Sequence, residues 1–178
     1  MGDRDRGYKL TDYIELDDAY VGGKRSGGKR GRGDEGKRAV LLAVERRGKG
    51  AGFMSAQVVD SISKETVKRF VDECIHPGQS VRTDAYPAMN VISKTQFHES
   101  RVTPGKEAGK WLSWIHIVIS NLKTFINGTF HGVSGGYLQE YLDEFCYRFN
   151  RRFWENELPN RLLNACLIHQ PIRIADFR

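Results

Sequence analysis

Cysteine is scarce in this sequence, and no part of it is both long and apolar. The three cysteines are far apart and form no Cys-x-x-Cys pair, which excludes a disulfide scaffold and argues against a structural zinc site. No apolar run approaches the ~20 residues that cross a bilayer, so we expect no contact with a membrane. The first residues are charged and precede no apolar stretch, unlike a secretory signal. We therefore expect a cytoplasmic protein.

The length and composition favour a single folded domain. The chain has 178 residues, of which 39% are hydrophobic, and this is enough for a sizeable core. Residues 1–12 are polar, charged and without a periodic pattern, and we interpret them as a leader or the remnant of a linker. Residues 13–178 then form the domain.

Positive charge is concentrated in one short segment, residues 24–38. Its seven basic and two acidic residues carry +5 of the chain's net charge of +6. Five glycines in the same segment predict a loop. A basic loop is typical of a surface that contacts nucleic acid, although a solvated insertion without a ligand has the same composition. The basic residues of this loop are Lys24, Arg25, Lys29, Arg30, Arg32, Lys37 and Arg38.

The periodicity of apolar residues predicts a mixed α/β domain. Strands are expected at residues 13–21, 39–44, 53–59, 80–84 and 94–98, the first three as an antiparallel meander. Helices are expected at residues 64–75, 85–91, 111–127, 137–153 and 160–169, and a loop at residues 99–110. This order of elements is that of a ribonuclease H-like mixed sheet with flanking helices and a long C-terminal helix.

Two aspartates fall where such a sheet would bring them together. Asp17 lies in the middle of the first strand and Asp84 at the end of the fourth, and these strands are neighbours in a ribonuclease H-like sheet. Adjacent carboxylates repel each other unless a cation lies between them, and Mg²⁺ or Mn²⁺ suits such oxygen ligands. Two such ions ~3.5–4 Å apart promote phosphodiester chemistry. Two structural alternatives stay open: Asp18 could be the inward residue, and Asp84 could cap the following helix.

A third ligand is expected from the helix at residues 111–127, which contains no acidic residue. His116 and Lys123 are seven residues apart and therefore share one face of that helix, with Ser120 between them. Asn121 lies about 140° away from His116 around the helix, and its amide oxygen is the rival ligand. Without further context, a single histidine on an apolar helix is more often a core residue.

Several stretches together resemble one family of proteins. The opening Asp-Asp-x-Tyr-x-Gly-Gly-Lys at residues 17–24 and the motif at residues 141–152 are each specific. With residues 81–86, 116–123 and 128–134 between them, the chain resembles DDE-type transposases of bacterial insertion sequences, in the ISXO-like branch. Full members usually carry an N-terminal DNA-binding region, so the chain looks like the catalytic domain alone.

The resemblance implies a ribonuclease H-like core that hydrolyses phosphodiesters at transposon ends and joins those ends to target DNA. It also implies a pair of Mg²⁺ or Mn²⁺ ions. By position, Asp17 matches the first catalytic aspartate and Asp84 the second. Many members have a glutamate seven residues before a lysine, and alignment on Lys123 places His116 at that position. His116 is thus the preferred third catalytic and metal-binding residue.

Further candidates and partners follow from the same resemblance. Asn121 is the alternative third ligand, and Glu140 and Glu144 are weaker candidates, since Glu144 could equally pair with Arg148 four residues later. Lys123 is expected to position the scissile-strand phosphate, and the basic loop to contact the phosphates of double-stranded DNA without reading its sequence. Transposases commonly act as dimers on paired DNA ends, so the resemblance is compatible with a homodimer.

Two other functions are consistent with the sequence. One is a catalytically impaired transposase remnant that still binds DNA, because the third carboxylate and an N-terminal DNA-binding region are missing. The other is a generic ribonuclease H-like nuclease that is indifferent to the sequence of transposon ends.

Overall fold

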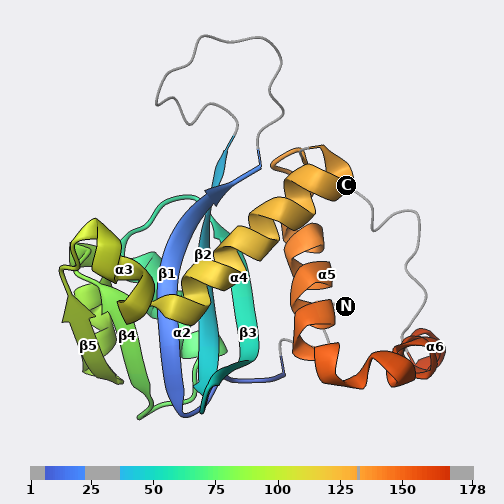
Figure 1. The fold of residues 1–178 in the computed structure, drawn as a ribbon, viewed down its shortest axis with the longest axis horizontal. Helices are drawn as coiled ribbons and strands as arrows, with labels where there is room; N and C mark the ends of the chain where they lie inside the picture. The colour runs from blue at the N-terminus through green and yellow to red at the C-terminus, as the bar shows by residue number, and fades with distance from the viewer. Residues whose placement is uncertain (1–6, 23–36, 132, 169–178) are drawn as a thin grey trace, which may run out of the picture.

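A five-stranded mixed sheet forms the centre of the protein (Figure 1). The computed structural model describes residues 7–22, 37–131 and 133–168. The strands lie in the order β3-β2-β1-β4-β5. β1, β2 and β3 are antiparallel neighbours, whereas β4 is parallel to β1 and β5 is parallel to β4. Their bounds are β1 (Tyr13–Val21), β2 (Arg38–Arg47), β3 (Gly50–Val59), β4 (Ser80–Asp84) and β5 (Phe97–Arg101).

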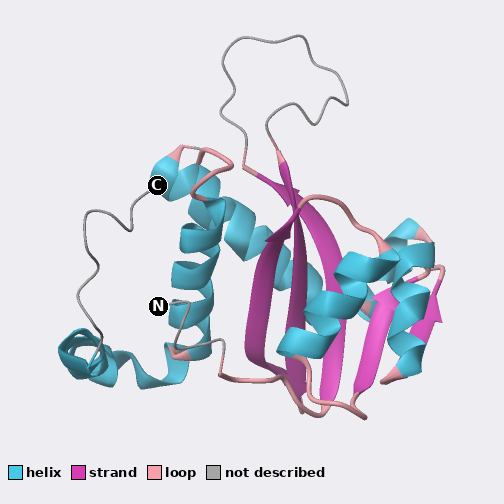
Figure 2. Cartoon of the chain, turned by 180° about the vertical axis from the view of Figure 1, so that it is seen from behind, coloured by secondary structure: helices cyan, strands magenta, loops and turns pink. Residues whose placement is uncertain are grey.

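Helices cover one face of the sheet through an apolar cluster. This face carries α2 (Lys64–Cys74) and the short 3-10 helix η1 (Pro87–Lys94), both visible in the view from behind (Figure 2). Phe70 of α2 and Met89 of η1 are fully buried in this cluster, together with Leu16 of β1. Leu16 and its alternate neighbours on β1 therefore point away from the other face.

The opposite face is covered by α4 (Ser113–Thr124) and α5 (Leu138–Asn150). Figure 1 shows α4 running diagonally across β1 and β2, with α5 beside β3. Ile115 and Val118 of α4 are fully buried against this face, which includes Leu42 of β2. Four shorter elements complete the fold: α3 (Gly105–Trp111), the π-helical turn η2 (Phe125–Thr129), the 3-10 helix η3 (Arg152–Glu157) and α6 (Leu158–Ile168).

This architecture confirms the predicted α/β class and agrees with a ribonuclease H-like arrangement. β2 is buried on both faces: residues 39–44 are buried, as their apolar run predicts, and so is Glu45. β1 and β4 are parallel neighbours with Glu15 opposite Arg82. Asp17 and Asp84 each lie two positions after these residues, so both come to the same end of the sheet.

Several element boundaries differ from the expectations. The predicted loop at residues 99–110 is wrong in part, because β5 continues to Arg101 and α3 occupies Gly105–Trp111. β5 also starts later than expected, at Phe97, since η1 continues to Lys94. The residues of β5 are polar and mostly exposed, so they give no apolar pattern that would reveal an edge strand.

The α-helix expected at residues 111–127 is shorter at both ends, where α4 covers only Ser113–Thr124. Leu112 has non-helical dihedral angles (φ −119°, ψ 55°) and separates α3 from α4, and the last residues form a π-helical turn. Leu112 is itself buried, so the apolar pattern runs on through the break. The long helix expected at residues 137–153 likewise ends at Asn150, and the last one begins at Leu158.

Part of the segment expected to be a leader joins the core. Leu10 is 2% exposed, its N–H donates to the carbonyl of Cys74 (2.8 Å), and its carbonyl accepts the N–H of His76 (2.9 Å). Ordered packing therefore begins before residue 13. Cys74 and Cys166 are free cysteines, and none of the helices in the described part of the chain could cross a membrane.

Candidate functional site

The fold brings Asp17 of β1 against His116 of α4. The distance between Asp17 Oδ2 and His116 Nε2 is 3.4 Å, and the two side chains are 16% and 38% exposed. Asp17 faces α4 because it alternates with Leu16, which faces α2. Asp18 donates its N–H to Asp17 Oδ1 (2.9 Å) and occupies the alternate position. Asp17 is thus the residue that faces α4.

Asp84 lies at the exposed end of β4, beside β1. Burial raises the pKa of both Asp17 and Asp18, and the nearby carboxylate of Asp84 raises both further. Asp84 Oδ1 also accepts the N–H of Tyr86 (3.1 Å), at the turn that leads into η1. The sequence allowed Asp84 to cap the following helix, but the N-cap of η1 is Tyr86, and the bond to Asp84 forms the turn before it.

Asp17 is held in an unfavourable electrostatic environment. Burial, together with the nearby carboxylates of Asp18 and Asp84, raises its pKa to about 6. The Asp18 N–H and the His116 ring lower the pKa only in part. Since a cation next to these carboxylates would favour their charged forms, the donor set fits a hard divalent ion. In the described ranges, however, no three His, Cys, Asp or Glu side chains are already arranged to hold a metal ion.

The polypeptide around Asp84 is supported by neighbouring side chains. Trp111 of α3 donates its Nε1–H to the carbonyl of Thr83 (2.9 Å), and the Thr83 hydroxyl lies 2.8 Å from His98 Nε2. Arg82 lies over the rings of Tyr13 (4.7 Å) and Trp111 (4.2 Å). These contacts attach the end of β4 to β5 and α3.

Glu15 is a residue that the sequence analysis did not single out. It is fully buried two positions before Asp17, and its Oε2 accepts the N–H groups of Trp114 (2.8 Å) and Ile115 (2.9 Å) at the start of α4. Burial raises its pKa. The sequence offered one signal for this residue: strand alternation places Glu15 on the same face of β1 as Asp17. In the structure, apolar residues cover that face.

Comparison with known proteins identifies the family of the chain. The sequence model of one protein family, the ISXO2-like transposase domain, matches residues 9–150, from just before β1 to the end of α5. The chain belongs to the ISXO2-like transposase domain family. A search of curated proteins finds no match. The match includes Asp17, Asp84 and His116, and the chain is accordingly a DDE-type transposase domain with a role on DNA.

The other candidate ligands of this transposase domain lie at other positions of α4 and on α5. Asn121 and Lys123 are exposed on α4, one and two turns beyond His116. Glu140 is exposed on α5. Glu144 forms an ion pair with Arg148 (2.7 Å), the alternative that its spacing suggested.

Only two of the seven basic loop residues can be placed in the transposase domain. Lys24, Arg25, Lys29, Arg30 and Arg32 lie outside the described residues. Lys37 is exposed, and Arg38 begins β2 opposite Val21, the last residue of β1. Arg38 also pairs with Asp60 at 3.9 Å, with both side chains largely exposed. The segment therefore leaves and re-enters the sheet at the end of β1 that lies beyond Asp17.

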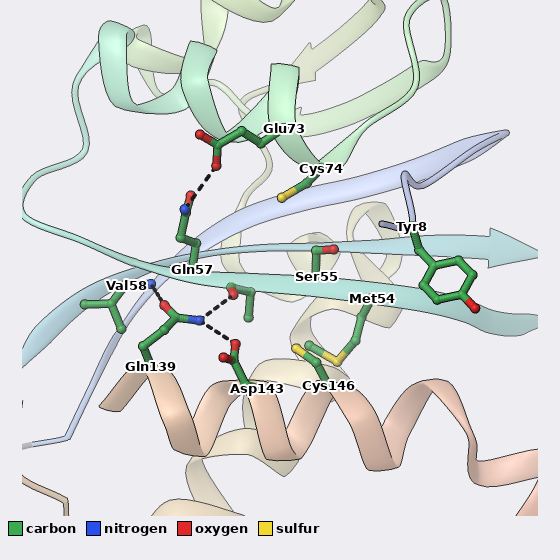
Figure 3. A pocket seen from close by; sticks show the side chains of 11 residues that line it. Tyr8, Met54, Ser55, Gln57, Val58, Glu73, Cys74, Gln139, Asp143 and Cys146 are labelled. Atoms are coloured by element: carbon green, nitrogen blue, oxygen red, sulfur yellow. Dashed lines mark hydrogen bonds between the residues drawn. The ribbon is translucent and has the colours of Figure 1, made fainter. Parts of the chain in front are cut away.

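A pocket of about 670 Å³ lies elsewhere, along β3 between α2 and α5 (Figure 3). Tyr8, Gln57, Cys74 and Gln139 are among its lining residues, and none of the predicted site residues lines it. The pocket is therefore separate from the aspartates of the transposase domain.

Proposed function

We propose that this domain catalyses the phosphodiester steps of DNA transposition, hydrolysis at transposon ends and strand transfer to target DNA. Asp17, Asp84 and His116 are the proposed catalytic and metal-binding residues. The observation that carries the proposal is the contact of Asp17 with His116, beside Asp84, in a setting that raises the pKa of Asp17 to about 6. Perturbed carboxylates grouped in this way are typical of active sites.

Asp17 and Asp84, with His116, would hold Mg²⁺ or Mn²⁺. When bound, a pair of these ions supplies charge neutralisation for the attacking and leaving oxygens of a phosphodiester. The Asp18 N–H and the His116 ring favour the ionised form of Asp17 and offset part of the cost of its burial. The exposed end of β4 leaves Asp84 room to approach Asp17 as a ligand.

The proposed contacts with DNA involve cationic side chains around this site. Lys123 lies on α4 beyond His116 and would bind the phosphate of the strand to be cut. The basic segment, with Lys37 and Arg38 at its end, would contact further backbone phosphates in a sequence-independent way. A homodimer acting on paired ends is part of the same proposal.

The main alternative is a transposase domain that binds DNA without cutting it. It is favoured by one observation: the described residues offer no ready-made cluster of three ligands. A generic nuclease would differ from both in cutting DNA without regard to the end sequence.

A nicking assay separates these functions. The substrate is labelled double-stranded DNA with the terminal inverted repeat of the element, incubated with Mg²⁺ or Mn²⁺, and a scrambled repeat serves as the control substrate. We expect nicking by the unmodified protein and none by Asp84→Asn. The matched control is Asp72→Asn, the same chemical change at an exposed aspartate of α2 on the other face of the sheet.

The same assay distinguishes the two candidate third ligands. We expect His116→Ala to remove nicking and Asn121→Ala to leave most of it, because His116 lies against Asp17 whereas Asn121 is exposed on α4. Absence of nicking with either metal would support the DNA-binding remnant. Equal cutting of the scrambled repeat would support a generic nuclease.

A further inference from the structure

The start of α4 lies over a buried carboxylate, that of Glu15. This side chain is fully inaccessible and points to the α4 face of the sheet, as does Asp17 two residues later. Around it lie apolar residues such as Leu112 and Ile115. A carboxylate is costly in such a place unless its hydrogen bonds are strong.

Glu15 makes two hydrogen bonds to the main chain of α4. Its Oε2 accepts the N–H of Trp114 (2.8 Å) and the N–H of Ile115 (2.9 Å), which lie 99 and 100 residues away in sequence. The first N–H groups of a helix have no partner within the helix, and they are usually capped by a nearby side chain. Leu112, at the N-cap position, provides no such side-chain bond. Glu15 thus supplies from β1 the cap that α4 lacks locally.

This cap bears directly on the geometry of the site, because His116 follows Ile115. Apolar contacts of Ile115, Val118 and Leu122 hold α4 on the sheet, but such contacts are not directional and allow sliding or rotation. Hydrogen bonds depend on distance and angle, so two of them from one oxygen define the place of the first turn. What Glu15 adds is therefore the register of the helix on β1.

We infer that Glu15 is a positioning residue that holds His116 within reach of Asp17 by capping α4 from β1. The consequence for catalysis rests on the proposed function, whereas the consequence for the position of His116 does not. Glu15 acts through α4 and touches neither DNA nor the reacting atoms.

The structural part is tested by NMR on the full chain. Glu15→Ala removes the acceptor, and Glu15→Gln keeps a neutral one. The matched control is Glu45→Gln, since Glu45 is also buried and accepts two main-chain N–H groups outside α4, those of Thr11 (2.9 Å) and Phe53 (3.1 Å). Two quantities are measured. One is hydrogen exchange at the Trp114 and Ile115 amides, and the other is nuclear Overhauser contacts between the imidazole ring of His116 and the side chain of Asp17.

In Glu15→Ala we expect the His116–Asp17 contacts to disappear and the two amides to exchange at least about tenfold faster. In Glu15→Gln we expect weakened contacts and exchange a few-fold faster, and in Glu45→Gln no change at these positions. Unchanged contacts in a folded Glu15→Ala protein would overturn the inference. If Glu15→Ala does not fold, unchanged exchange in Glu15→Gln overturns it instead.

The functional part is tested by a double-mutant cycle in the nicking assay. If Glu15 acts through His116, Glu15→Gln lowers the nicking rate about tenfold in the unmodified protein but hardly changes the residual rate of a His116→Ala protein, in which no side chain at this position remains to be positioned. Equal effects in both backgrounds would show a merely structural role and overturn the functional part. If the unmodified protein does not nick with any divalent metal, the proposed function fails, and the NMR result still decides whether Glu15 positions His116.

Discussion

Two helices cover the same face of the sheet, and each is attached to a strand by polar side chains, but in different ways. α4 is held over β1 by a carboxylate, and next to it lie Asp17 and His116. α5 is held along the edge strand β3 by neutral amides: Asn150 accepts the N–H of Met54 (2.7 Å) and donates to its carbonyl (3.0 Å). Farther along β3, Gln139 accepts the N–H of Val58 and donates to the carbonyl of Ala56 (3.3 Å) (Figure 3).

The α5 contact has the character of a structural joint. An amide both donates and accepts, so Asn150 pairs with Met54 much as a neighbouring strand would, and Gln139 accepts the N–H of Val58 (2.8 Å). Arg152 donates to the carbonyl of Gly52 (3.2 Å). These side chains occupy the backbone groups of an edge strand, which would otherwise be open to pairing with another chain.

The α4 contact contains groups whose charges are poorly compensated. Burial and like charges raise the pKa of Asp17, burial raises that of Glu15, and one oxygen of Glu15 is buried without a hydrogen-bond partner in the described structure. Such an arrangement costs stability, and proteins retain it where function requires it. The two contacts therefore separate the proposed catalytic region from a supporting one within a single face of the sheet.

The largest expected effect concerns activity at the α4 contact. We predict that Asp17→Asn lowers metal-dependent nicking by at least about a thousandfold, because an amide carries no negative charge and binds a divalent ion much more weakly than a carboxylate. The measurement is the initial nicking rate at saturating Mg²⁺ or Mn²⁺. Asn150→Asp, which also exchanges an amide and a carboxyl group but at the α5 contact, serves as the control and should act through stability alone. A comparable rate loss per folded molecule in this control would remove the distinction between the two contacts.

The next effect concerns stability at the α5 contact. We predict that Asn150→Ala destabilises the fold by about 2–4 kcal/mol, because it leaves the buried N–H and carbonyl of Met54 without their partner. Urea unfolding followed by circular dichroism measures the change. Gln139→Ala should cost less, since Gln139 is only partly buried. The nicking rate per folded molecule should not change, and a large fall would assign α5 a part in catalysis.

A smaller effect is expected in the pH dependence of stability. The pKa of Asp17 is raised from 3.8 to about 6 in the folded state, so the folded protein binds this proton more tightly than the unfolded chain. The stabilisation is complete below pH 3.8 and is lost as the pH rises through about 6.

We therefore predict that Asp17→Asn is more stable than the unmodified protein at pH 7, by about 1–3 kcal/mol, with the difference shrinking toward pH 4. Thermal unfolding without divalent metal at several pH values measures it. A difference independent of pH would mean that the charge of Asp17 is not the cause.

The smallest effect per residue is expected from the basic segment that follows β1. Replacing its seven basic residues by serine should weaken DNA binding and lower the slope of log K against log salt concentration by up to about 6. Replacing Lys37 and Arg38 alone should lower it by about 2. The matched control replaces Lys64 and Arg69, two exposed cations of α2 on the other face. Equal slopes in all variants, from fluorescence anisotropy over a salt series, would identify the segment as a solvated insertion.

Much of the fold could be predicted from local patterns, because each depends on neighbours in sequence. The apolar run at β2 and the helical spacing at α2 and α5 state which faces must be buried, and the order of elements then leads to the mixed sheet. The interruption at Leu112 could not be predicted, since a buried residue keeps the apolar pattern intact whether or not its backbone is helical. α3 has only seven residues, too few to produce a periodic pattern.

The candidate site divides in the same way. The sequence by itself determined that Asp17 ends up beside the strand of Asp84, because parallel pairing of β1 with β4 follows from the fold class, and that His116 and Lys123 share a helix. Only the tertiary structure decided what Glu15 and Asn150 do. Their partners are main-chain groups about 100 residues away, and every residue type offers the same N–H and carbonyl, so no pattern of side chains in the sequence could reveal them.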